Sequence, residues 1–223
     1  MKIGIIGSGK FGLVLARIAV ENGNQVSIYS RRQAEVDSLN EKKKSLSGFS
    51  FTGYEISATS DPSDLNQCEV LLITVASKDF KEVIKNINYK SQKGKFVSCV
   101  KGFDTNTGKL MTEVLIDDFD IESKDVFVLS GPNLSKELDN KELTGTVIAG
   151  EDQNFINCLC NALKTEYFIP FVNTDRYGVE LGGALKNVYA ILSGYFHKKG
   201  VGENTIGLLL SLIHISEPTR PYW

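Results

Sequence analysis

The sequence lacks several features that would each indicate a class of protein. No apolar run approaches the roughly 20 residues of a membrane-spanning helix, and the start, MKIGIIGSG, is too short and too rich in glycine for a signal peptide. Only four of the 223 residues are cysteines. None forms a C-x-x-C pair, so reduced thiols in a cytoplasmic protein are expected rather than disulfides or a metal site. The net charge is only −2, which argues against a partner that is a nucleic acid.

Ordinary globular composition is present instead, with 42% hydrophobic and 23% charged residues. Short apolar runs typical of strands alternate with helical stretches, which predicts an α/β fold with a Rossmann-type doubly wound parallel sheet. The runs are KIGIIG, QVSIY, VLLITVA, KFVSCV, DVFVLS, TGTVIAG and YFIPFV. We expect a dinucleotide-binding domain over residues 1–172 and the start of an all-helical substrate domain over residues 173–209.

A glycine loop follows the first predicted strand. GSGKFG, from Gly7 to Gly12, matches G-x-G-x-x-G and precedes an amphipathic helix. In such loops the first glycine allows a tight turn, Gly9 would let a pyrophosphate approach the backbone, and the last glycine lets helix and strand pack closely. The helix N-terminus supplies N–H groups and partial positive charge. This context favours dinucleotide binding over a simple turn.

The second predicted strand ends in SIYSRR, without the Asp or Glu that usually binds the ribose 2′-hydroxyl of NAD. Arg31 and Arg32 are suited to a 2′-phosphate, because guanidinium groups bind phosphate with two hydrogen bonds. NADP(H) is therefore favoured, with NAD still open. The alternative is two exposed arginines at the start of a helix.

Two further loops follow predicted strands and so lie at the edge where parallel sheets bind ligands. In SCVKGFD, Lys101 lies in such a loop. It is either a contact for an anionic ligand or an ordinary surface lysine. In LSGPNLSKEL, Ser130 or Gly131 is expected to cap a helix that begins at Pro132.

ELGGALKNVYAI reads as a helix with Lys186 in its middle. The lysine aligns with small residues, Gly182 and Gly183 among them, which would let a backbone or a ligand come close. Lys186 is therefore either a proton donor or acceptor, or a structural lysine.

Taken together, these motifs resemble the bacterial-type NAD(P)-dependent glycerol-3-phosphate dehydrogenases. IGSGKFG, VKGFDTNTGKLMTEVL, LSGPNLSKEL, VELGGALKNVYAI and GENT occur in family order over roughly residues 1–209. The resemblance implies an enzyme that reduces dihydroxyacetone phosphate to sn-glycerol 3-phosphate for glycerophospholipid synthesis. It also implies a cytoplasmic location, and it allows the full-length parent to form a homodimer.

Carried over by motif, Lys186 would be the catalytic proton donor or acceptor. The implied substrate contacts are Lys101, Gly131, Asn133, Lys186 and Asn187. The implied cofactor contacts are Gly7, Ser8, Gly9, Lys10, Phe11, Gly12, Arg31, Phe80, Lys101 and Ser135. Asn133 stands where the family often has Ser or Thr, and Ser135 stands where it often has Ala. No metal is expected.

The end of the chain departs from the family pattern. LSLIHISEPTR, residues 210–220, matches the in-frame translation of a sequencing-library transposase adapter. We therefore expect residues 210–223 to be non-native and the parent to be C-terminally truncated here. A natural divergent C-terminus is the alternative. Because the family's remaining substrate residues lie beyond this point, we expect little or no turnover by this chain.

Two other functions stay open. One is another NADPH-dependent two-domain reductase, such as ketopantoate reductase, and LSGPNLSKEL argues against it. The other is a non-catalytic nucleotide-binding module that senses redox state, and the position of Lys186 argues against it.

Overall fold

The computed structural model describes residues 1–87, 94–202, 204–205 and 207–208, without the side chain of Asn187. Its strands are β1 (Lys2–Ile6), β2 (Gln25–Tyr29), β3 (Ile56–Thr59), β4 (Val70–Ile73), β5 (Lys95–Ser98), β6 (Val126–Ser130), β7 (Thr144–Ala149) and β8 (Phe168–Asn173). Its α-helices are α1 (Lys10–Glu21), α2 (Gln33–Lys42), α3 (Ser77–Asn86), α4 (Met111–Glu113), α5 (Ser135–Asp139), α6 (Gln153–Leu163) and α7 (Arg176–Lys198). Shorter turns of other helix types are η1 (Pro62–Gln67), η2 (Val114–Asp118) and η3 (Ser123–Asp125). The expected tail, residues 210–223, lies outside the described residues.

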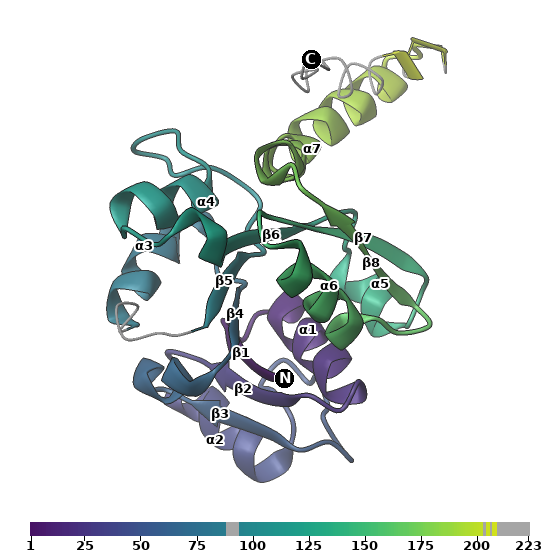
Figure 1. The fold of residues 1–223 in the computed structure, drawn as a ribbon. Coiled ribbons are helices and arrows are strands. Elements are labelled where there is room, and N and C mark those ends of the chain that lie inside the picture. The colour runs from purple at the N-terminus through teal and green to yellow at the C-terminus, as the bar shows by residue number, and fades with distance from the viewer. Residues whose placement is uncertain (88–93, 203, 206, 209–223) are drawn as a thin grey trace.

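The strands form one sheet in the order β3-β2-β1-β4-β5-β6-β7-β8 (Figure 1). From β3 to β6 all neighbouring strands are parallel. The strand order reverses between β1 and β4, which is the place where doubly wound sheets bind ligands. The predicted α/β fold class is therefore confirmed.

One pairing departs from the parallel pattern of the sheet. β6 and β7 are antiparallel, and β8 then runs parallel to β7. The reason lies in the connection between β6 and β7. A parallel crossover is usually carried by a helix that runs back along the strand. The connection over residues 131–143 contains only the five-residue helix α5.

The edge strand β3 was missed by the sequence analysis. Its four residues, ISAT, alternate between buried and more exposed positions. Because only one face of this strand is covered, it has no continuous apolar run to mark it.

Helices cover both faces of the sheet (Figure 1). Neighbouring residues of a buried strand therefore belong to different cores. Leu72 belongs to the core that also contains residues of α1, α2, α5 and α6, whereas Leu71 and Ile73 belong to the core that contains residues of η1, α3, α4 and η2. This alternation explains why the central strands read as continuous apolar runs.

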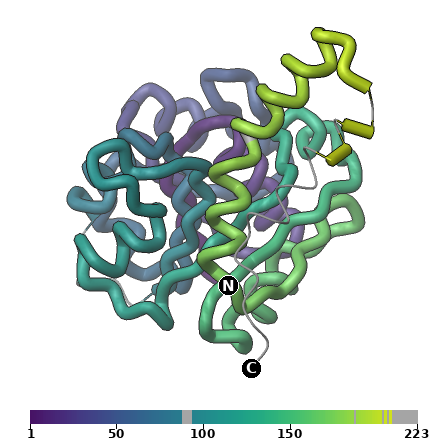
Figure 2. Tube along the Cα trace, turned by 90° about the horizontal axis from the view of Figure 1, so that it is seen from above, coloured from purple at the N-terminus to yellow at the C-terminus, as the bar shows by residue number. Residues whose placement is uncertain are grey.

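Helix α7 begins beside β8 and follows β6 on the face that also carries α4. Near its start, Arg176 donates to the carbonyl oxygens of Ser123 and Val126, at 2.8 and 3.0 Å. Its later turns extend away from the sheet (Figures 1 and 2). Val188 and Leu192, two apolar residues of this helix, are 53% and 41% exposed.

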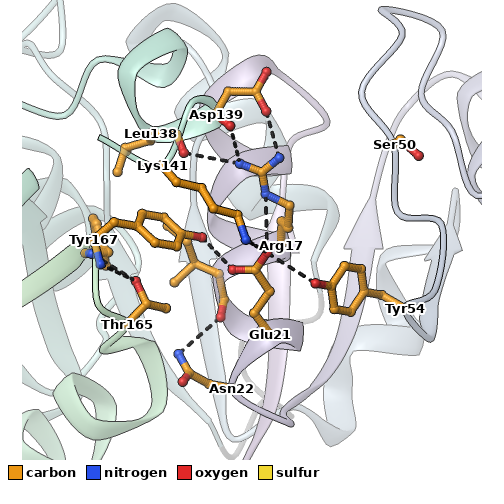
Figure 3. Close-up of polar contacts among 12 residues, drawn as sticks. Arg17, Glu21, Asn22, Ser50, Tyr54, Leu138, Asp139, Lys141, Thr165 and Tyr167 are labelled. Atoms are coloured by element: carbon orange, nitrogen blue, oxygen red, sulfur yellow. Dashed lines mark hydrogen bonds and ion pairs between the residues drawn. The ribbon is translucent and has the colours of Figure 1, made fainter. Parts of the chain in front are cut away.

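A polar network ties α1 to more distant segments (Figure 3). Glu21 accepts a hydrogen bond from the Tyr167 hydroxyl at 2.6 Å and pairs with Lys141 at 2.9 Å. One turn earlier, Arg17 pairs with Asp139 at 2.7 Å. These contacts join α1 to the end of α5 and to the start of β8. They therefore stabilise the domain at a distance from the site described below.

Candidate active site

The loops that follow β1, β4, β5 and β6 meet at one edge of the sheet, since the carboxyl ends of parallel strands lie together. Hollows line this edge. The β1–β2 hollow is lined by Gly7, Ser8, Gly9, Tyr29, Ser30, Arg31, Arg32, Thr74, Val75, Ala76, Asp79 and Val83. The β4–β5 hollow is lined by Phe11, Thr74, Val75, Ala76, Ser77, Cys99, Val100, Lys101 and Asn133. The α7 hollow is lined by Ser130, Gly131, Pro132, Val147, Asn173, Gly178, Val179, Gly182, Gly183 and Lys186. Residues 74–76 line both of the first two hollows, so these two lie next to each other.

The glycine loop has the steric environment that its motif predicts. Gly7 has a φ of +114°, where a side chain would be strained. A Cβ on Gly12 would lie 2.2 Å from the carbonyl oxygen of Gly7, so the helix and the loop can only pack this closely through glycine. A Cβ on Gly9 would meet nothing within 4 Å. The space beside Gly9 is therefore open to a ligand, whereas Gly12 is needed by the fold itself.

Thr74, at the end of β4, holds this loop from the other side. Its hydroxyl lies 3.0 Å from the carbonyl oxygen of Ile6 and 3.1 Å from that of Gly7. The sequence analysis did not identify this residue. The only available signal was its place at the end of an apolar strand next to the glycine loop.

The predicted arginines both line the β1–β2 hollow. Arg31 is half exposed and pairs with Asp79 at 3.6 Å and Glu82 at 3.8 Å, both from α3. Arg32 pairs with Glu35 at 3.4 Å. These pairs are long and open to solvent on the arginine side, so either guanidinium group is able to turn toward an anion in the hollow.

Lys101 lies in the β4–β5 hollow, where its amino group donates to the carbonyl oxygen of Gly131 at 3.1 Å. Burial lowers the pKa of Lys101, and the positive charge of Lys186 lowers it further. Two lysines that are 85 residues apart in the chain therefore face one region. An anionic ligand between them would relieve their repulsion.

Lys186 lines the α7 hollow together with Gly131, Gly182 and Gly183. A Cβ on Gly183 would lie 2.2 Å from the hydroxyl oxygen of Ser130. The small residues beside Lys186 thus allow α7 to approach the end of β6 closely, as the stripe of small residues predicts. The side chain of Asn187, the other predicted contact on this helix, lies outside the described residues.

The loop after β6 differs from its prediction. The helix α5 begins at Ser135 rather than at Pro132. The N–H of Asn133 instead donates to the carbonyl oxygen of Gly131 at 2.8 Å, and the Asn133 amide nitrogen donates to the Thr146 hydroxyl at 3.0 Å. The helix begins only after this turn and after Leu134, which is extended. Asn133 is buried, and within the described part of the chain its amide oxygen has no partner, so that oxygen is available to a donor on a ligand.

Three predicted cofactor contacts lie elsewhere. Lys10 and Ser135 line a separate hollow with Lys136 and Asp139. Phe80 is fully buried in the core formed by α3 and α4, and it does not line the hollows defined above. Their roles as contacts stay predictions.

A buried carboxyl group beside this site was missed. Glu180 is 1% exposed and accepts hydrogen bonds from the N–H of Thr112 at 3.1 and 3.3 Å. Burial raises the pKa of Glu180 to about 7, against smaller lowering contributions from Thr112, Ser98 and Arg176. Its signal in the sequence was its place three residues before Gly183, on a side of the helix where close packing was expected.

Two absences apply to the described residues alone. Among them, no group of three or more His, Cys, Asp or Glu side chains is arranged to hold a metal ion. The helices of the described part also include none that is long and apolar enough to cross a membrane.

Comparison with known proteins gives a consistent result. Residues 2–156 match the family described as the N-terminus of NAD-dependent glycerol-3-phosphate dehydrogenase, and residues 175–217 match its C-terminus. The glycerol-3-phosphate dehydrogenase [NAD(P)+] of Ectopseudomonas mendocina is 36% identical over 222 residues, which are 98% of this chain and 64% of that protein. That of Alcanivorax borkumensis is 36% identical over 93% of this chain and 61% of its own length. The chain thus spans somewhat less than two thirds of these relatives.

Solved structures agree. The crystal structure of glycerol-3-phosphate dehydrogenase from Coxiella burnetii superposes with a TM-score of 0.78 at 26% identity, covering 94% of this chain and 65% of that one. The Plasmodium falciparum enzyme, at 23% identity and a TM-score of 0.82 over 96% of this chain and 63% of that one, shows the same fold. The match of the N-terminal family model covers more than half of the chain, with the glycine loop, Lys101 and Asn133 inside it. This chain therefore belongs to the NAD-dependent glycerol-3-phosphate dehydrogenase family.

Proposed function

We propose that this chain carries the cofactor domain and the catalytic lysine of an oxidoreductase that reduces dihydroxyacetone phosphate to sn-glycerol 3-phosphate with NAD(P)H. The observation that carries the proposal is the convergence of Lys101 and Lys186 at the same edge of the sheet as the open glycine loop. The relatives' names support the substrate, and the family resemblance supports a cytoplasmic role in glycerophospholipid synthesis, with a homodimer as the proposed assembly of the full-length parent.

The residues fit a nicotinamide dinucleotide. The space beside Gly9 is open, α1 presents its N-terminus there, and Arg31 and Arg32 line the same hollow. At the end of β2 these arginines stand where an NAD site usually has an acidic residue. We therefore propose NADP(H) as the preferred cofactor. The remaining proposed contacts are Gly7, Ser8, Lys10, Phe11, Gly12, Phe80, Lys101 and Ser135.

When bound, the reduced nicotinamide supplies a hydride for the carbonyl carbon. The protein's part is to hold the substrate and to neutralise the developing charge on oxygen. Lys186 would donate the proton to that oxygen. Lys101 would hold the anionic substrate, with Gly131, Asn133 and Asn187 as further contacts. For Asn133, the amide oxygen, which has no hydrogen-bond partner among the described residues, is the atom that would accept from a substrate hydroxyl.

A direct test begins with binding. The chain is titrated with NADPH and then with NADH, each followed by nicotinamide fluorescence, and the titrations are repeated with Arg31→Ala. We expect NADPH to bind more tightly, and Arg31→Ala to weaken NADPH more than NADH. Equal weakening of both would refute the assignment of the 2′-phosphate site, and no binding of either would refute the cofactor domain.

The substrate is tested by consumption of NADPH with dihydroxyacetone phosphate or with ketopantoate, using this chain and a full-length relative in parallel. We expect the relative to use only dihydroxyacetone phosphate and to lose activity with the lysine equivalent to Lys186 replaced by Ala. This chain is expected to turn over slowly or not at all. Full activity of the lysine variant would refute the catalytic role of Lys186, whereas no activity of the relative with either substrate would favour the redox-sensing module.

A further inference from the structure

Glu180 is a carboxyl group in an unfavourable place. It is 1% exposed, and taking a carboxylate out of water costs several kcal/mol unless hydrogen bonds compensate. Its partner is Thr112, which is itself 2% exposed and donates to it through both the backbone N–H and the side-chain hydroxyl. Both of these donors belong to one residue, so Thr112 is a point at which the carboxyl group is attached to α4.

That point joins two parts of the fold that are 68 residues apart in the chain. Thr112 belongs to α4, which packs in the core on one face of the sheet, whereas Glu180 belongs to α7. Ser98, at the end of β5, lies close enough to lower the pKa of Glu180. β5 leads directly into the loop that carries Lys101, so the anchor of α7 is next to the base of the other lysine.

A second contact lies three residues further along α7. Gly183 is pressed against Ser130 at the end of β6, where an added Cβ would come within 2.2 Å of the hydroxyl oxygen. In a helix with 3.6 residues per turn, Gly183 lies about 60° around the axis from both Glu180 and Lys186, between the two. Two contacts at neighbouring positions fix both the rotation of the helix and its position along its axis. Lys186, three residues beyond the second contact, takes its direction from them.

We propose that Glu180 is a positioning residue: by holding Thr112 of α4, its carboxyl group fixes the rotation of α7 so that Lys186 faces Lys101 and Gly131. The inference rests on the proposed function for its meaning in catalysis, but the arrangement of the two lysines is testable without any reaction. Glu180 acts through Lys186 and does not itself touch the substrate.

The reporter is the pKa of Lys101, because the nearby charge of Lys186 is one of the two causes that lower it. If α7 rotates or loosens, Lys186 moves away and the pKa of Lys101 rises. The full chain is labelled with 13C-methyl groups on its lysines and titrated by NMR, and the Lys101 signal is assigned with Lys101→Arg. Lys186→Met removes the charge of Lys186, so it gives the largest rise in the pKa of Lys101 that loss of this charge interaction can produce.

We expect Glu180→Ala and Thr112→Val to raise the pKa of Lys101 by amounts comparable to that of Lys186→Met. Thr112→Val retains the shape of the side chain and the backbone N–H. It therefore still tests the proposal through the pKa of Lys101 if Glu180→Ala does not fold. Thr112→Ser retains both donors and should leave the pKa unchanged.

Two controls separate positioning from general damage. Glu166→Gln removes an exposed carboxylate of the same type, and Tyr167→Phe weakens the network around Glu21 without touching α7. Neither should move the pKa of Lys101. The proposal is overturned if Lys186→Met raises that pKa while Glu180→Ala and Thr112→Val do not, or if Lys186→Met has no effect. Because neither cofactor nor substrate is present, these outcomes do not depend on whether the proposed reaction is correct.

Discussion

The buried carboxyl group of Glu180 should make the stability of this protein fall as the pH rises. Burial raises its pKa from an ordinary value of 4.5 to about 7. Between these two values the folded protein holds a proton that the unfolded chain has already lost. The free energy of unfolding therefore decreases with rising pH through this window and stays at the lower level above it.

The size of the effect follows from the shift. One pKa unit corresponds to about 1.4 kcal/mol, so a shift from 4.5 to about 7 gives roughly 3 kcal/mol as an upper value. Glu180→Gln removes the titration while retaining an oxygen that accepts from the Thr112 N–H. The variant should match the parent protein near the acidic end of the window and exceed its stability above pH 7, by up to roughly 3 kcal/mol.

The assay is urea unfolding followed by circular dichroism, at about pH 5 and about pH 8, for the parent chain and for Glu180→Gln. The informative quantity is the change in the difference between the two proteins, because other titrating groups are common to both. Glu166→Gln serves as the matched control, since its carboxyl group is exposed. A difference between parent and Glu180→Gln that is the same at both pH values would show that Glu180 does not titrate in this window, and the reasoning would fail.

Other predictions follow from single contacts. Gly9→Ala should leave the urea midpoint nearly unchanged and weaken NADPH binding in the fluorescence titration, because the added Cβ meets nothing within 4 Å in the protein. Gly12→Ala should lower both stability and binding, since its Cβ would lie 2.2 Å from a backbone carbonyl oxygen; a stable Gly12→Ala that binds NADPH normally would contradict this. Tyr167→Phe removes a 2.6 Å hydrogen bond to Glu21 and should cost about 2 kcal/mol in urea unfolding, with NADPH affinity unchanged. A loss of NADPH affinity equal to that of Gly9→Ala would show that this network also shapes the site.

Local sequence patterns predicted those parts of the site whose conformation depends only on a short stretch of the chain. The loop from Gly7 to Gly12 is such a stretch, because a tight turn and a close packing contact each require glycine wherever the motif occurs. Lys101 was identified by its position after a predicted strand, and Lys186 by its position beside small residues of a helix. The family resemblance then gave each lysine a specific role. The division at residue 172 and the nature of residues 210–223 stay predictions.

Local patterns failed where a distant segment decides. α5 begins at Ser135 because the turn at Asn133 is anchored by Thr146, on the next strand. β7 runs antiparallel to β6, and the connection between them lacks the long helix of a usual parallel crossover. The edge strand β3 shows no apolar run because one of its faces is exposed.

The sequence by itself determined the α/β alternation, the glycine loop and the residue types available for chemistry, because these depend on hydrophobic spacing and on the conformational freedom of single residues. Only the tertiary structure decided that Lys101 and Lys186 share one region, and that Glu180 is buried against Thr112 rather than exposed. The physical reason is that the charge interactions and the burial of a side chain depend on distances between segments. Those distances are set by how the helices pack on the sheet, and no local stretch of the chain records them.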